Sequence, residues 1–83
     1  MPKVYGSMLC HDCVEAKEYF EKVNYKYEFV NITESMKNLK EFLALRENRK
    51  EFDDAKKFGY VGIPAILTDD NKIILGDEVL QVK

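Results

Sequence analysis

Short apolar segments alternate with amphipathic helical segments along this chain, and the alternation ends in two apolar segments separated only by a turn. The first predicted strand covers residues 3–6 and the second covers residues 26–32. Residues 65–68 and 72–75 flank turn-forming residues and are predicted to form a hairpin. Strands joined through a helix lie parallel and hairpin strands lie antiparallel, so this pattern predicts a mixed four-stranded sheet.

Two helices and two shorter helical pieces are predicted around these strands. The first helix, residues 11–23, has an apolar stripe at three- and four-residue spacing, formed by Cys13, Ala16, Phe20 and Val23. A short helical piece covers residues 52–58, and a last helix runs from Gly76 to Lys83. The resulting order, β-α-β-α-β-β-α, predicts an α/β fold with helices packed on the sheet.

The second helix is expected over residues 34–48, with Thr33 as its N-cap. Its predicted apolar face consists of Met36, Leu39 and Leu43, and Phe42 broadens that face. Residues 52–58 either continue this helix through a bend or form a separate helix, and the sequence leaves both arrangements open.

Length and charge limit the classes of protein to which the chain can belong. Its 83 residues suffice for one small domain, which we expect to span residues 1–83. The net charge of −2 provides no basic surface for nucleic acid or for an anionic membrane. No segment approaches the roughly 18–20 apolar residues of a membrane span, and we expect no signal peptide before the first strand. We expect a cytoplasmic location and a monomer.

The only two cysteines lie three positions apart in Cys10-His11-Asp12-Cys13, between the first strand and the first helix. Unpaired N–H groups and the dipole at a helix N-terminus favour a thiolate, which is the form that attacks disulfides and binds metals. His11, when protonated, favours the neighbouring thiolate, whereas Asp12 opposes it. The pair therefore indicates either thiol-disulfide exchange or binding of a soft metal.

Three features together make the chain similar to the glutaredoxins, which have a thioredoxin-like fold. They are the cysteine pair after the first strand, Gly62-Ile63-Pro64 before the third, and Gly76-Asp77 after the fourth. The resemblance covers essentially the whole chain and implies a four-stranded mixed sheet with helices on both faces. It departs from the usual pattern where His11-Asp12 replaces Pro-Tyr and where Ser7 replaces an upstream lysine.

The resemblance implies a role for each of these residues. Cys10 would be the nucleophile and Cys13 the resolving thiol, and Pro64 would be cis and lie against the pair. Gly62, Ile63, Pro64, Gly76 and Asp77 would bind the substrate or glutathione. No bound cofactor and no metal are expected. Glutathione is the expected co-substrate, and protein disulfides are the expected substrates.

Basic residues between positions 46 and 57 include candidates for a contact with the carboxylates of glutathione. Lys57, the one nearest to the Gly62–Pro64 segment, is the residue that we expect to make it.

A different function uses the same cysteines. Met8, Cys10 and Cys13 match the Met-x-Cys-x-x-Cys spacing of small copper-binding domains, whose soft sulfur ligands suit Cu(I). Those domains have two strands between their two helices, whereas a single strand is predicted here. An iron-sulfur cluster held by Cys10 and glutathione is a further alternative. Thiol-disulfide exchange is the interpretation that the sequence favours.

Overall fold

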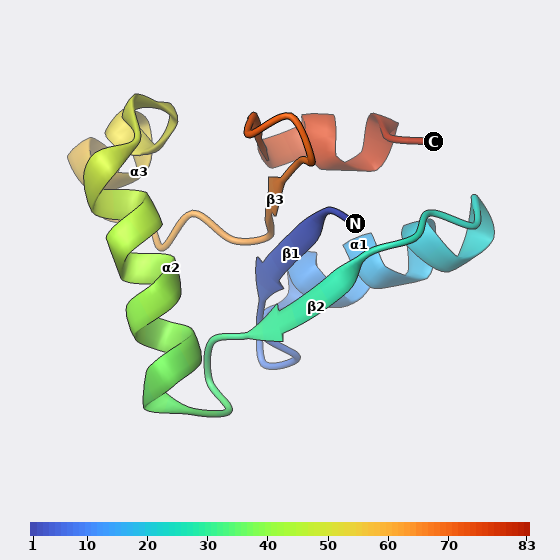
Figure 1. The fold of residues 1–83 in the computed structure, drawn as a ribbon, viewed down its shortest axis with the longest axis horizontal. Coiled ribbons are helices and arrows are strands. Elements are labelled where there is room, and N and C mark those ends of the chain that lie inside the picture. The colour runs from blue at the N-terminus through green and yellow to red at the C-terminus, as the bar shows by residue number, and fades with distance from the viewer.

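The computed structural model describes all 83 residues as a four-stranded sheet with helices on both faces (Figure 1). The strands are β1 (Lys3–Gly6), β2 (Glu28–Asn31), β3 (Ala65–Leu67) and β4 (Ile73–Leu75). The α-helices are α1 (His11–Lys22), α2 (Met36–Asn48) and α3 (Asp53–Phe58). Two 3-10 helices, η1 (Lys50–Phe52) and η2 (Gly76–Gln81), precede α3 and follow β4.

The strand order across the sheet is β2-β1-β3-β4. β1 pairs in parallel with β2 and antiparallel with β3, and β3 pairs antiparallel with β4. Tyr5 in β1 lies opposite Val30 in β2 and Ala65 in β3. The predicted mixed sheet is thus confirmed, and the fold is thioredoxin-like. One strand, β2, lies between α1 and α2.

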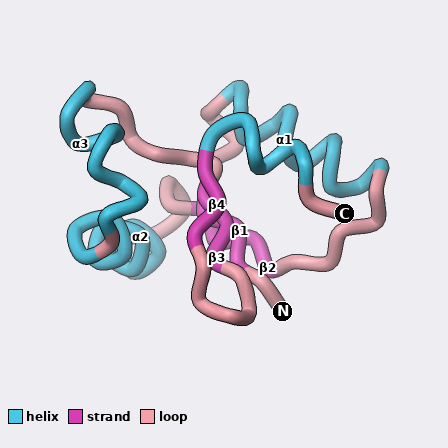
Figure 2. The backbone as a smooth tube through the Cα atoms, turned by 90° about the horizontal axis from the view of Figure 1, so that it is seen from above, coloured by secondary structure: helices cyan, strands magenta, loops and turns pink.

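Alternation along β1 divides the core into two layers. Tyr5 packs with Phe42 and Phe52 on the face covered by α2 and η1. Val4 points to the opposite face, where it packs with Phe20 of α1 and with other buried residues. Figure 2 shows α1 and α2 on different sides of the strands. Both faces of the central strands are therefore buried, as expected for a sheet covered by helices on two sides.

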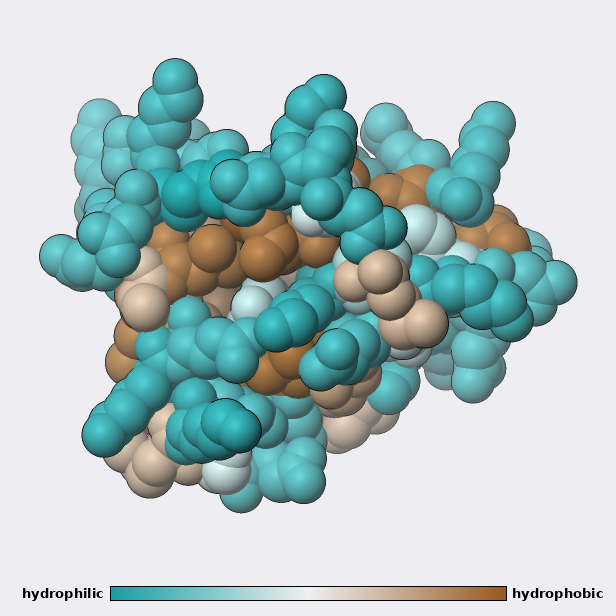
Figure 3. All heavy atoms as spheres, in the orientation of Figure 1, coloured by the Kyte–Doolittle hydropathy of each residue, from teal (hydrophilic) through white to brown (hydrophobic).

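The predicted apolar face of α2 is wrong in part. Phe42 is fully buried and Leu39 and Leu45 are partly buried, whereas Met36 and Leu43 are 65% and 45% exposed. The helix presents the ridge of residues three positions apart to the sheet, and this ridge places the bulky Phe42 ring against Tyr5 and Phe52. The face of the molecule seen in Figure 3 is mainly hydrophilic, with hydrophobic residues gathered in a band.

The start of α2 also differs from the prediction. Ser35, not Thr33, is the N-cap, and its Oγ accepts a hydrogen bond of 3.1 Å from the Asn38 N–H. The Thr33 hydroxyl is instead 2.7 Å from the Ser7 hydroxyl, so it links the ends of the two parallel strands.

Three other elements are shorter than predicted or separate from their neighbours. The helical piece after α2 is separate from it, because Arg49 is extended and ends the helix. β2 begins only at Glu28, since Tyr25 and Tyr27 pack against Phe20 instead of extending the strand. The last helix is a 3-10 helix that ends at Gln81. None of the helices is both long and apolar enough to cross a membrane.

Candidate active site

The two cysteines lie where β1 passes into α1. Cys10 is the N-cap of α1, with extended backbone angles, and its N–H donates to the Ser7 carbonyl at 3.1 Å. Its own carbonyl accepts the first hydrogen bonds of the helix, from the N–H groups of Cys13 and Val14. Cys13 therefore lies about one helical turn after Cys10, on the same face of α1 as Cys10. Both cysteines are free thiols.

The two thiols differ sharply in accessibility. Cys10 is partly exposed, whereas Cys13 is 1% exposed. Cys13 packs against Gly6, where a side chain of any size would meet its Sγ at 3.0 Å. The absence of a side chain at Gly6 thus lets α1 bring its second cysteine close to the end of β1. Only Cys10 can be reached by a bulky substrate.

Burial raises the pKa of the Cys13 thiol to well above its ordinary value, and the neighbouring Cys10 and Asp12 raise it further. A hydrogen bond from the backbone of Ser7 opposes this shift but does not cancel it. Cys13 therefore keeps its proton at neutral pH, close to the sulfur of Cys10.

The Gly62–Pro64 loop reaches the same end of the sheet. The Ile63–Pro64 peptide bond is cis, as the family resemblance implied, and Pro64 is buried. Ala65 pairs with Tyr5 in the antiparallel arrangement of β1 and β3. The preceding residue, Pro64, therefore lies beside Gly6, the residue that follows Tyr5. Gly62 has φ +94°, and a Cβ there would lie 3.0 Å from the Phe52 ring, so both its backbone and its surroundings require glycine.

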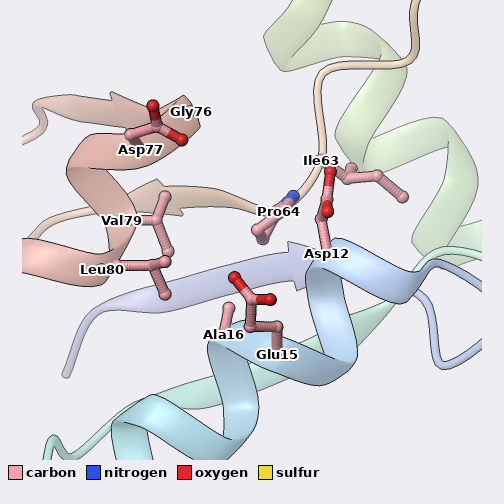
Figure 4. Close-up of a pocket in the computed structure, with 9 residues that line it drawn as sticks. All are labelled: Asp12, Glu15, Ala16, Ile63, Pro64, Gly76, Asp77, Val79 and Leu80. Carbon is pink, nitrogen blue, oxygen red and sulfur yellow. The ribbon is translucent and has the colours of Figure 1, made fainter.

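Two cavities flank Pro64. The first, of about 120 Å³, is enclosed by α1, the Ile63–Pro64 segment and η2 (Figure 4). Its lining residues are Asp12, Glu15, Ala16, Ile63, Pro64, Gly76, Asp77, Val79 and Leu80. The second, of about 300 Å³, lies toward α3 and shares Asp12, Ile63, Pro64 and Gly76 with the first. The two cavities together form a groove along Pro64. Because Asp12 lies between the two cysteines in the sequence and lines both cavities, this groove lies beside the cysteine pair.

The structure brings together most of the residues that the sequence singled out. Ile63, Pro64, Gly76 and Asp77 line the first cavity, and Gly62 lines the second. Gly76 has φ +64° with open space around it, so its backbone conformation alone favours glycine. His11 is exposed and lines neither cavity, whereas Asp12 lines both.

Several lining residues were not identified from the sequence. Glu15, Glu51 and Asp54 contribute carboxylates to the groove. For Glu15 a signal was present, because it follows Asp12 by three residues and so shares a face of α1 with it. Glu51 and Asp54 come from η1 and α3, whose position relative to Pro64 depends on tertiary packing.

The basic residues considered as contacts for glutathione lie elsewhere. The Lys57 ammonium is 5.3 Å from the centre of the Phe58 ring, and Lys57 lines neither cavity. The Arg46 guanidinium donates to the carbonyls of Tyr60 and Val61, at 2.8 and 2.9 Å. Arg49 donates to the Asn71 carbonyl at 2.8 Å. These two arginines hold loops in place. No lysine, arginine or histidine lines the groove.

No group of three or more histidine, cysteine, aspartate or glutamate side chains is arranged to hold a metal ion. The site consists of an accessible thiol, a buried thiol and a cis-proline loop. This combination defines a dithiol site of the thioredoxin-fold class.

Comparison with known proteins specifies the family. The model of the glutaredoxin family matches residues 3–73, and the chain belongs to that family. An uncharacterized protein of Haemophilus influenzae is 33% identical over 81 residues, which cover 98% of this chain and 94% of that protein. No solved structure matches the chain significantly. The family, together with the dithiol site, supports a redox function of the thioredoxin-fold type.

Proposed function

We propose that this protein is a thiol-disulfide oxidoreductase in which Cys10 attacks the disulfide and Cys13 resolves the intermediate. The observation that carries the proposal is the contrast between the accessible Cys10 at the start of α1 and the buried Cys13 beside it. A nucleophile must reach its target, whereas a resolving thiol need only reach the nucleophile.

The reaction then has two exchange steps. The Cys10 thiolate attacks one sulfur of the substrate disulfide, forms a mixed disulfide and releases the other sulfur as a thiolate, which takes up a proton. Cys13 gives up its proton and attacks the Cys10 sulfur, which releases the second substrate thiol and leaves a Cys10–Cys13 disulfide. The substrate gains two electrons and the protein loses two. A thiol donor must reduce the pair again before the next turnover.

The cis-proline loop is suited to hold the substrate during the first step. Gly62 and Ile63 offer backbone groups next to Pro64, and an extended segment could pair with them along the groove. Such pairing would fix the substrate disulfide near Cys10 without requiring a particular side chain. We propose this role for the loop as a whole.

Paired variants of the two cysteines test the mechanism. Cys10→Ser should abolish reduction of a peptide-glutathione mixed disulfide, whereas Cys13→Ser should retain part of it, because an external thiol can replace the resolving step. The two variants make the same chemical change three residues apart, so each is the control for the other. Equal loss in both, with the folded state retained, would contradict the assigned roles.

We also propose glutathione as a candidate donor that recycles the pair, as is usual in the family. A coupled assay should compare NADPH consumption with glutathione and glutathione reductase against NADPH consumption with thioredoxin reductase alone. Turnover with glutathione supports a glutathione-dependent enzyme. Turnover only with thioredoxin reductase would contradict glutathione dependence while leaving the dithiol mechanism intact.

A further inference from the structure

Carboxylates line both halves of the groove beside the cysteine pair. Asp12, Glu15 and Asp77 line the first cavity, and Figure 4 shows Pro64 between the α1 side, with Asp12 and Glu15, and the η2 side, with Asp77. Asp12, Glu51 and Asp54 line the second cavity. The groove around Pro64 is thus acidic at both ends, although the whole chain has a net charge of only −2.

Little positive charge compensates these carboxylates. Glu51 forms an ion pair with Arg49 at 3.2 Å, but Asp12, Glu15, Asp54 and Asp77 form none. No basic side chain lines either cavity. A concave surface lined by charge of one sign concentrates ligands of the opposite sign and repels those of the same sign.

The two residues directly before the nucleophile are apolar and exposed. Leu9, directly before Cys10, is 86% exposed, and Met8 is 48% exposed. An exposed leucine and methionine suit contact with the side chains of a polypeptide. Neither side chain can form a strong hydrogen bond with the charged groups of a small anionic thiol.

We propose that this groove selects disulfides in cationic polypeptide segments, with lysine or arginine close to the substrate cysteine. The inference rests on the proposed oxidoreductase function and specifies its substrate class. The substrate chain would lie along Pro64 with its disulfide at Cys10, its basic side chains near the unpaired carboxylates, and an apolar residue against Leu9. The chemical step is the exchange described above, in which the peptide disulfide is reduced and the Cys10–Cys13 pair is oxidised. Glutathione, which carries two carboxylates and a net negative charge, would be a poorer occupant of this groove.

The test measures how fast the fully reduced protein is oxidised by three synthetic peptide disulfides. The peptides differ only in the two residues that flank the cysteine, which are lysine, serine or glutamate. Because the chain contains no tryptophan to report the reaction, samples are quenched with acid and quantified by mass spectrometry. At low ionic strength the lysine peptide should react about tenfold faster than the glutamate peptide. The ratio should approach one at about 1 M salt, where the screening length is about 3 Å.

A double variant localises the effect to the groove. Glu15→Gln with Asp77→Asn removes two lining carboxylates and leaves Asp12 intact, because Asp12 lies between the cysteines. The ratio of lysine-peptide to glutamate-peptide rates should fall by about two- to tenfold, from the usual worth of exposed charge pairs. Glu18→Gln with Glu21→Gln is the matched control: both residues lie on α1, are exposed and line no part of the groove. It makes the same change in net charge and should leave the ratio unchanged.

The outcomes distinguish a failure of the proposed substrate class from a failure of the proposed oxidoreductase function. Equal rates for the three peptides would overturn the substrate class and leave the oxidoreductase function standing. An equal fall of the ratio in the control variant would overturn the groove as its origin, because net charge alone would then explain the preference. Failure to react with even the serine peptide would overturn both proposals.

Discussion

Gly6 lies at the end of β1, where the chain has no room for a side chain. An added methyl group would lie 3.0 Å from the Cys13 Sγ and 3.2 Å from the Phe29 Cε1. Favourable contacts between carbon atoms are about 3.5–4.0 Å long, so Gly6→Ala forces its neighbours apart by roughly half an ångström. Gly6 lies in a strand without a positive φ, so the substitution tests packing and not backbone strain.

Two opposing contributions determine how much Gly6→Ala changes the free energy of unfolding. Overpacking a buried site costs about 1–3 kcal/mol. Replacing glycine with alanine returns about 0.4–1 kcal/mol, because it restricts the unfolded chain. Gly6→Ala should therefore lower the free energy of unfolding by about 1–2 kcal/mol, which is a fall in Tm of about 5–15 °C for a domain of this size.

A double-mutant cycle identifies the sulfur as the contact. The free energy of unfolding of the reduced protein is measured by urea denaturation for Gly6→Ala, Cys13→Ala and the double variant. Cys13→Ala removes the Sγ, so the penalty of Gly6→Ala should shrink or change sign in that background. Gly59→Ala is the control: Gly59 has φ +81° and open space, so its backbone penalty should be the same in both backgrounds. An equal Gly6→Ala penalty in both would refute the assigned contact.

Three more predictions concern the buried Cys13 thiol and the Tyr5 hydroxyl. Iodoacetamide at pH 7 should modify Cys10 and spare Cys13 until the protein is unfolded, and peptide mapping that finds equal labelling would contradict this. Because folding raises the pKa of Cys13 from its ordinary value, the stability that the neutral thiol provides is complete below about pH 9 and is lost between about pH 9 and 12. The free energy of unfolding of the reduced protein should fall more steeply over that range than that of Cys13→Ala, and parallel curves would exclude the effect. Tyr5→Phe should lower the free energy of unfolding by about 1–2 kcal/mol in urea denaturation, because the Tyr5 hydroxyl donates to the Glu41 carboxylate at 2.6 Å, and an unchanged value would show that water replaces this bond.

Local pattern was sufficient for the element order and for the dithiol. The stripe through Cys13, Ala16 and Phe20 is buried as predicted, because residues at this spacing share one face of any α-helix. Cys10 is the N-cap of α1. The sequence indicated this position, because the apolar strand ends before Cys10 and the helical periodicity begins after it. These features depend on residues close together in the chain.

Local pattern failed where packing chooses between similar alternatives. Met36 and Leu43 fit an apolar helical face as well as Leu39 does, yet only contact with Tyr5 and Phe52 decides which side of α2 faces the sheet. Thr33 and Ser35 are both good N-caps, and the hydroxyl of Thr33 is taken by Ser7 from the neighbouring strand.

The sequence by itself determined the order of strands and helices and the spacing of the two thiols, because periodicity and turn chemistry act over a few residues. Only the tertiary structure decided what packs against the buried thiol and which charges surround the pair. Burial of Cys13 depends on the missing side chain of Gly6, and the acidic groove combines Glu15, Asp54 and Asp77 from three separate helical elements. Solvent exclusion and the meeting of distant carboxylates are properties of the packed chain, and they set the pKa of the buried thiol and the charge of the groove.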